Sequence, residues 1–403
     1  MSNLIGVIGI LAILGTAFAL SNNRKVISWR LVLVGLGGQL VLALMILKLP
    51  GFTDLFALMG DGIKSLLDFS KEGAAFVFGE DLAKGRFVFL IAVGSSIIFM
   101  SALSSLAYYF GIMQVVVKAL AWVMQRTMGV SGAEALSSAS SIFVGQVESQ
   151  FLIKPYMSKL TSSELFCAMT VNMATIAGTV LVAYTAMGMN AIYLIAASVM
   201  SAPAGIVIAK MMVPETDKEA VMNQISLNIE KQGENVFDAF AHGVQEGGKV
   251  AANVMIMVLA AVAFIAFANS VLGAGLSVFG LSFQIQDIFG VFMTPVAFLM
   301  GVPANECFEV GRMMATEIIV NEFVSYGDLA KHIQDGTLTP KTQLIATIAL
   351  CGFANLSSIA INIGGLSAMA PERRGEIARI GFKALVAANM ATWLTAAVAG
   401  ILF

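Results

Sequence analysis

GQVES at 145–149 and VPANE at 302–306 decide the fold, because each interrupts an otherwise apolar region. The surrounding regions, 118–158 and 285–330, are too broken for one membrane-spanning helix and too apolar for a water-exposed loop. Such segments are typical of re-entrant hairpins, whose non-helical tips lie at membrane depth only inside protein or beside a water-filled cavity. We therefore expect two hairpins that enter the membrane from opposite sides.

Composition places the chain in a membrane. Of 403 residues, 58% are hydrophobic and only 12% are charged, whereas soluble domains carry about a quarter charged residues. The net charge of −2 gives no electrostatic reason to expect nucleic acid as a partner. Cys167, Cys307 and Cys351 lack paired spacing and predict free thiols. Composition therefore predicts the lipid bilayer as a partner, and it indicates no cofactor.

Eight apolar runs have the roughly 20 residues that a spanning helix needs. They lie at 4–20, 31–48, 87–112, 164–187, 190–213, 250–275, 342–367 and 380–403. If residue 1 is outside, most basic residues of the connections fall inside, as the positive-inside bias requires. Arg24, Lys25 and Arg30 follow the first run, which predicts a retained helix and not a cleaved signal. We expect a multi-pass protein of a bacterial inner membrane with both termini in the periplasm.

Each predicted hairpin is followed by a polar connection and a span with an interrupted middle. These spans read TSSELFCAMTVNMATIAGT at 161–179 and TPKTQLIATIALCGFANLSSIA at 339–360. A hairpin and a broken helix that occur twice with opposed topology form the inverted repeat of secondary transporters, whose substrate site lies at the midplane. The predicted fold is an all-α polytopic membrane protein with eight transmembrane helices and two re-entrant hairpins.

The same pattern divides the chain into scaffold and transport segments. The predicted segments are N-terminal spans with an interfacial helix, mainly scaffold, at 1–112; the first hairpin and broken helix at 113–213; a cytoplasmic linker at 214–249; a scaffold span at 250–284; the second hairpin and broken helix at 285–370; and the last span at 371–403.

Glu148 and Glu306 lie in the two polar breaks. An ionised carboxylate near the bilayer centre costs about 2.5–3.5 kcal/mol, so each is protonated, paired or open to an aqueous site. The alternative is that each caps a hairpin helix. Gln146, Asn355 and Ser358 are neutral hydrogen-bonding groups nearby, which suit a neutral, hydroxyl-rich solute. The alternative for Asn355 and Ser358 is hydrogen bonding between helices.

TEIIVNEFVSY at 316–326 follows the second polar break and carries two more acids. A solvated helical face accounts for Glu317. Glu322 is followed at once by Phe323 and Val324, and it is a weaker candidate for coupling or gating.

These motifs together resemble the concentrative nucleoside transporter family. The resemblance covers nearly the whole chain in order, through VGQVES at 144–149, KPY at 154–156, VPANE at 302–306, VNEFVSY at 320–326, CGFANLSSIA at 351–360 and PERRGEIARIG at 371–381. It implies a homotrimer of eight spans and two hairpins per subunit, with a nucleoside substrate. It also implies an elevator mechanism, in which a transport domain moves against a trimerisation scaffold.

The resemblance also implies roles for single residues. Gln146 and Glu148, with Val147 between them, would contact the nucleobase; Glu306, Asn355 and Ser358 would hold the ribose, with Phe353 beside the site. The sodium site of sodium-coupled members resembles Ser141, Val144, Thr175 and Ile176. This sequence departs from the common pattern where Ser141 replaces an Asn, Val147 a hydroxyl residue and Ala304 a Trp.

The departures shape the functional expectation. Ser141 is a weaker sodium ligand than Asn, and Glu148, Glu306 and Glu322 can carry protons, so we expect proton-coupled nucleoside import with sodium coupling as the alternative. Val147 cannot donate to a pyrimidine carbonyl, which favours purine nucleosides. A channel or sensor for a small polar solute is the competing class. An enzyme is not expected, because GxSxG and HExxH motifs are absent.

Overall fold

The computed structural model describes the chain except for residues 1, 86–87, 218, 220, 222–232 and 278–282. The described residues form helices and no strand. Six helical stretches are long and apolar enough to cross a membrane. They are α2 (Trp29–Leu47), α4 (Phe89–Tyr109), the stretch Ser162–Ala186, α10 (Ala191–Met212), the stretch Val236–Gly275 of α11, and Pro371–Leu402, which contains α17 (Arg374–Leu402). The shorter α1 (Ser2–Ala19) and a broken helix near the C-terminus complete the eight predicted spans.

Both hairpins are present, and each has a non-helical tip. The first consists of α6 (Gly132–Ser141) and α7 (Glu148–Phe151), and the second of α12 (Ile285–Leu299) and α13 (Cys307–Ile319). The first hairpin is shorter than the predicted 118–158. A separate helix, α5 (Ile112–Met128), precedes it and ends at Gly129, whose φ of 68° is in the left-handed region that glycine tolerates best.

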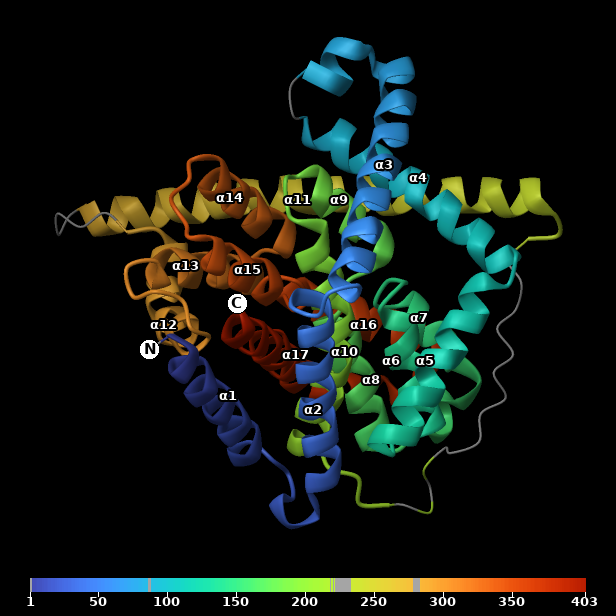
Figure 1. Cartoon of the computed structure of the whole chain (residues 1–403), viewed down its shortest axis with the longest axis vertical. Helices are drawn as coiled ribbons and strands as arrows, with labels where there is room; N and C mark the ends of the chain where they lie inside the picture. Colours follow the sequence, from blue (N-terminus) through green and yellow to red (C-terminus); the bar gives the residue numbers. More distant parts are fainter. Residues whose placement is uncertain (1, 86–87, 218, 220, 222–232, 278–282) are drawn as a thin grey trace.

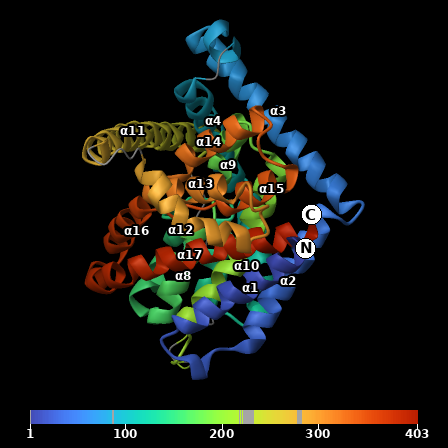
Figure 2. The ribbon, with the colours of Figure 1, turned by 90° about the vertical axis from the view of Figure 1, so that its left-hand side faces the viewer.

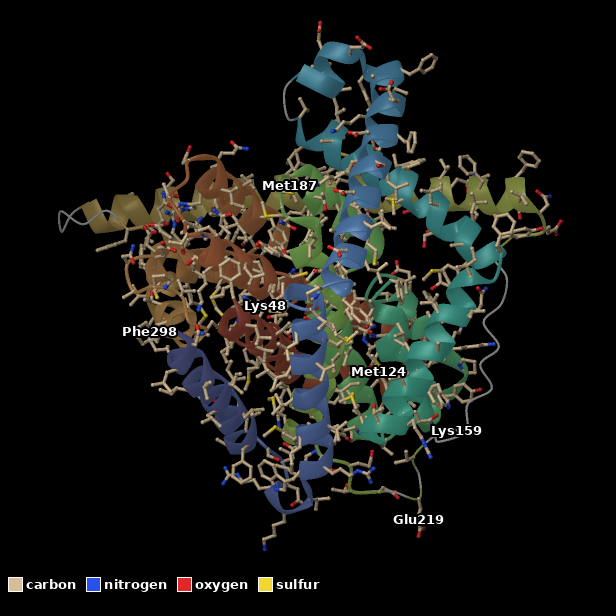
Figure 3. The ribbon with its side chains drawn as sticks, viewed as in Figure 1. Lys48, Met124, Lys159, Met187, Glu219 and Phe298 are labelled. Atoms are coloured by element: carbon tan, nitrogen blue, oxygen red, sulfur yellow. The ribbon has the colours of Figure 1, made fainter. Side chains whose placement is uncertain are left out.

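Two broken helices follow the hairpins. α8 (Ser162–Ala174) and α9 (Gly178–Ala186) form the first, and α15 (Pro340–Ala349) and α16 (Leu356–Met369) the second. α8 and α15 start with the same device, a threonine whose hydroxyl caps the backbone N–H three residues on, namely Thr161 and Thr339. Lys159, before α8, and Met187, after α9, lie toward opposite ends of the molecule, so the first broken helix follows its long axis (Figure 3).

The outer helices are long and largely exposed. α11 (Val236–Ser277) runs across the molecule, and α3 (Phe52–Phe78) lies on the opposite side (Figures 1 and 2). α11 packs against α4 through Gly247, where an added Cβ would lie 2.8 Å from the Ile98 Cα. The predicted linker 214–249 lies partly outside the described residues, and its last part, from Val236, is already α11.

The remaining elements are short. α14 (Glu322–Gln334) connects the second hairpin to the second broken helix. The other short elements are 3-10 turns at Arg24–Val26, Lys154–Lys159 and Pro371–Arg373, and a π-helical turn at Asp81–Gly85.

α10 and α17 pass through the interior and are mostly buried. Near the end of α10, the buried Lys210 contacts the Glu134 carboxylate of α6 and donates to Ser163 Oγ at 2.8 Å. Glu134 also accepts from the Ser131 backbone N–H at 2.9 Å, so the same side chain caps α6. This buried pair ties the base of the first hairpin to α10.

Candidate substrate site

A cavity of about 1020 Å³ lies between the repeats and the outer helices. One wall comes from the first hairpin tip, from Asn321–Phe323, and from the break before α16. The other wall comes from α4 and α11, which contribute Ser101, Ser104, Tyr108, His242, Glu246 and Asn253. Among the residues that line it are Gln146, Val147, Glu148, Glu322, Phe353, Asn355 and Ser358. Lys154 also reaches the cavity, although no basic residue lies in the polar breaks themselves.

Asn355 lies in the break before α16 and caps the N-terminus of that helix. Its Oδ1 accepts from the Ser358 backbone N–H at 3.0 Å, and its Nδ2 donates to Glu322 Oε2 at 2.9 Å. The other carboxylate oxygen of Glu322 accepts from the Tyr184 hydroxyl at 3.0 Å. Glu322 is the first residue of α14, where the helix dipole favours a negative charge. Helix geometry and two donors therefore fix this carboxylate at the cavity wall.

The first hairpin tip supplies three adjacent lining residues. The Gln146 amide lies between Asn362 Nδ2, at 3.0 Å from its Oε1, and Ser358 Oγ, at 3.4 Å from its Nε2. The Val147 methyl groups fill the space left by Gly365, where an added Cβ would be 2.7 Å from Val147 Cγ1. The exposed side chain of Glu148 lies over Gly145. Polar and apolar groups therefore alternate along the tip.

Glu306 lies elsewhere, contrary to the expectation that it holds the ribose beside Asn355. It is not among the described residues that line the cavity. Its carboxylate accepts from the Thr339 hydroxyl at 3.0 Å and from the Thr339 backbone N–H at 3.3 Å. It therefore joins the second hairpin tip to the start of α15. The acid that faces the cavity next to Asn355 is Glu322.

Glu317 corrects a second expectation, because it does not lie on a solvated face. Its side chain is fully buried, and neither carboxylate oxygen accepts a hydrogen bond from a residue that the structure describes. The sequence offered one signal for the difference between the two acids. Asn321 stands directly before Glu322, and an Asn at that place predicts a helix N-terminus, which would turn Glu322 out of the preceding helix.

The ends of α6 and α8 lie side by side. Ser198 Oγ donates to the Ile142 carbonyl at 3.2 Å and to the Ile176 carbonyl at 3.5 Å, and Gly178 N donates to the Phe143 carbonyl at 3.0 Å. Ser141, Val144, Thr175 and Ile176 belong to these adjoining segments. Two helix C-termini place partial negative charge here, which favours a cation. In the described ranges, His, Cys, Asp and Glu form no group of three that could hold a metal.

The repeated pair of hairpin and broken helix, with a cavity beside it, is the architecture of a secondary transporter. Three family models match the chain: the N-terminal part of Na⁺ dependent nucleoside transporters at residues 8–81, nucleoside recognition (gate) at 90–191, and the C-terminal part of Na⁺ dependent nucleoside transporters at 193–400. The chain belongs to the concentrative nucleoside transporter family. It is a transporter and not an enzyme.

Relatives and solved structures match over the full chain. An uncharacterised transporter of Haemophilus influenzae is 42% identical, covering 100% of this chain and 98% of the relative. Sodium/nucleoside cotransporter 1 of Mus musculus is 39% identical, covering 99% of this chain and 64% of the relative. The structure of CNTnw in an inward-facing, substrate-bound state has a TM-score of 0.95 at 36% identity and covers 100% of this chain and 98% of that one.

Proposed function

We propose that this protein is a sodium-coupled symporter that imports nucleosides through the cavity beside Glu322. One observation carries the proposal: two donors orient the Glu322 carboxylate at the cavity wall and leave part of its acceptor capacity free. A carboxylate offers about four lone-pair sites, and Tyr184, Asn355 and the backbone N–H of Glu322 itself use three of them. The remaining capacity suits a ribose hydroxyl.

The other lining residues complete a nucleoside site. Asn355 and Ser358 lie next to Glu322 and would contact the sugar, whereas Gln146 and Glu148 would contact the base and Phe353 would stack beside it. Glu306, which binds Thr339, takes no part in this assignment. Glu322 replaces it as the ribose carboxylate.

We propose sodium as the coupling ion, in place of the proton that the sequence favoured. Two of the matching family models describe Na⁺ dependent transporters, and a mouse relative is a sodium/nucleoside cotransporter. Ser141 Oγ donates to the Ser138 carbonyl at 2.9 Å and Thr175 Oγ1 to the Val171 carbonyl at 3.0 Å, so each hydroxyl oxygen keeps lone pairs for a ligand. Backbone carbonyls of Val144 and Ile176 would complete an oxygen set of the kind that a hard cation prefers.

The preference for purine nucleosides remains part of the proposal. Val147 presents an apolar surface to the cavity and is held in place by its contact with Gly365. A larger ring would cover more of this surface. Replacement of Val147 by Ser should therefore shift selectivity toward pyrimidine nucleosides.

The long exposed helices fit the rest of the proposed organisation. α11 carries exposed apolar side chains along its length, including Ile256, Leu259, Phe264 and Phe267. We propose that α11 and α4 belong to the scaffold of a homotrimer, and that the hairpins and broken helices move against it in an elevator cycle. The proposed location is a bacterial inner membrane, with both termini periplasmic.

Reconstituted vesicles test the ion and the substrate together. Labelled inosine, adenosine, uridine and cytidine are offered with an inward sodium gradient, with choline in place of sodium, and with a protonophore. We expect uptake that needs sodium and resists the protonophore. Uptake that follows the proton gradient in sodium-free buffer would restore the proton alternative, and failure of all four nucleosides to enter would refute the nucleoside proposal.

A further inference from the structure

Asn362, on α16, has an amide whose orientation is determined by a backbone atom. Its Nδ2 donates to the Ser358 carbonyl at 2.9 Å and to Gln146 Oε1 at 3.0 Å, and its Oδ1 accepts from Gln150 Nε2 at 3.1 Å. A backbone carbonyl only accepts hydrogen bonds, so the nitrogen of Asn362 must face Ser358. The two ends of this amide therefore cannot exchange places without loss of that bond.

The fixed amide of Asn362 in turn orients Gln146. Because Asn362 presents N–H groups, Gln146 must present its oxygen to Asn362 and its nitrogen to the other side. On that side Gln146 Nε2 lies 3.4 Å from Ser358 Oγ, whose own proton goes to Asn355 Oδ1 at 3.2 Å. Ser358 therefore accepts from Gln146. Because a hydroxyl can either donate or accept, Ser358 adapts to the orientation of the Gln146 amide, and Asn362 is the neighbour that determines it.

The oriented amide has one N–H left for a ligand. Gln146 lines the cavity, and its oxygen is turned toward Asn362, away from the unused N–H. Resting on the proposed function, we propose that Asn362 is a positioning residue that makes Gln146 a dedicated hydrogen-bond donor to the base. The transporter would then favour nucleosides whose base carries an oxo group at the contacted edge over those that carry an amino group. An oxo group accepts a hydrogen bond from the Gln146 N–H, whereas an amino group would place its own N–H donor against that N–H.

Two substrate pairs probe this contact, because uridine and cytidine, like inosine and adenosine, differ at an oxo or amino group and at the hydrogen of the adjacent ring nitrogen. We expect the wild-type kcat/KM to be about tenfold higher for the oxo member of each pair, the size of one hydrogen bond. Asn362→Leu removes both polar groups at similar volume and frees Gln146 to rotate. In this variant the ratio of kcat/KM for the oxo nucleoside to kcat/KM for the amino nucleoside should fall toward one.

Gln150→Leu is the matched control. It removes a buried amide from the same hydrogen-bonded chain, yet the Ser358 carbonyl still fixes Asn362. Its ratio should stay that of the wild type even if total uptake falls. Gln146→Glu serves as the second variant, because its carboxylate still accepts from Asn362 but offers the base no donor. It should lose the oxo preference as well.

The outcomes separate this inference from the proposed function. A wild-type ratio near or below one, or an Asn362→Leu ratio equal to that of the wild type, would overturn the inference while nucleoside transport stands. Should Asn362→Leu fail to fold, an oxo preference that survives in Gln146→Glu would overturn it equally. If the wild type carries no nucleoside, the proposed function itself fails.

Discussion

The Tyr184 hydroxyl, on the broken helix of the first repeat, donates at 3.0 Å to Oε1 of Glu322, which follows the hairpin of the second repeat. Tyr184 is fully buried, and its ring also contacts Phe323 and Tyr326. The carboxylate at the cavity is thus held by a side chain from the opposite half of the molecule. The site exists only while both halves are assembled.

Glu322→Gln should lower the kcat/KM for nucleoside uptake about tenfold to a hundredfold. The amide has one acceptor oxygen instead of two, so its NH₂ group either opposes the Asn355 nitrogen, which only donates, or takes the place of the acceptor for the Tyr184 hydroxyl. Hydrogen bonds to charged groups contribute about 1.5–3 kcal/mol. Glu317→Gln is the matched control, since this buried acid lies off the cavity wall and its variant should retain uptake. Equal losses in both variants would contradict the role of Glu322.

Glu306→Gln should leave nucleoside affinity within about twofold of the wild type. The change weakens the contacts with Thr339 that join the second hairpin tip to α15, and the loss of one hydrogen bond to a charged group costs about 1.5–3 kcal/mol. We therefore expect a lower unfolding temperature in detergent and an unchanged dissociation constant by calorimetry. A large loss of affinity with unchanged stability would return Glu306 to the substrate site.

Lys210→Met should destabilise the protein by about 3–5 kcal/mol, because it leaves Glu134 buried without its cation. Thermal unfolding of the purified protein measures this loss. The double variant Lys210→Met with Glu134→Gln should recover part of the stability, since no uncompensated charge remains. If the double variant is less stable than Lys210→Met, the buried charge of Glu134 is not the cause of the instability of Lys210→Met.

Gly247→Ala should reduce the yield of folded protein, and Gly248→Ala should not. A Cβ at Gly247 would lie 2.8 Å from the Ile98 Cα and 2.7 Å from the Ser101 Cβ on α4, whereas a Cβ at Gly248 meets nothing within 4 Å. The two changes have the same helix propensity, so they differ only in this contact. Monodisperse protein recovered by size-exclusion chromatography gives the comparison, and equal yields would contradict close packing of α4 and α11.

Hydropathy predicted the architecture because lipid imposes it. An apolar run of roughly 20 residues can only be a helix in a bilayer, and the eight predicted spans follow. The first hairpin is shorter than predicted because α5 is amphipathic, so its mixed polar and apolar sequence is similar in hydropathy to a hairpin arm. The sharp turn at Gly129 is a local backbone feature that hydropathy does not register.

The site was predicted less completely than the fold. Gln146, Val147, Glu148, Phe353, Asn355 and Ser358 do line one cavity. The role of Glu306 at the ribose rests on the family resemblance, but a motif in the sequence does not show which way a side chain points, and the Glu306 carboxylate lies against Thr339. The Asn362 contact with Gln146 joins residues 216 positions apart. Such a pairing depends on how α16 packs against the hairpin tip, which spacing along the chain does not reveal.

The two walls of the cavity have a pharmacological consequence. Glu322 and Asn355 lie on one wall, and His242 lies on α11 in the other wall. The glycines of α11 allow this helix to pack closely against α4. A nucleoside that carries an extended substituent could bind Glu322 and His242 at once and fasten the two walls together. Such a compound would occupy the site without being released, and would thus act as a blocker instead of a substrate. Lengthening the substituent should convert transported compounds into inhibitors at the length that first reaches His242.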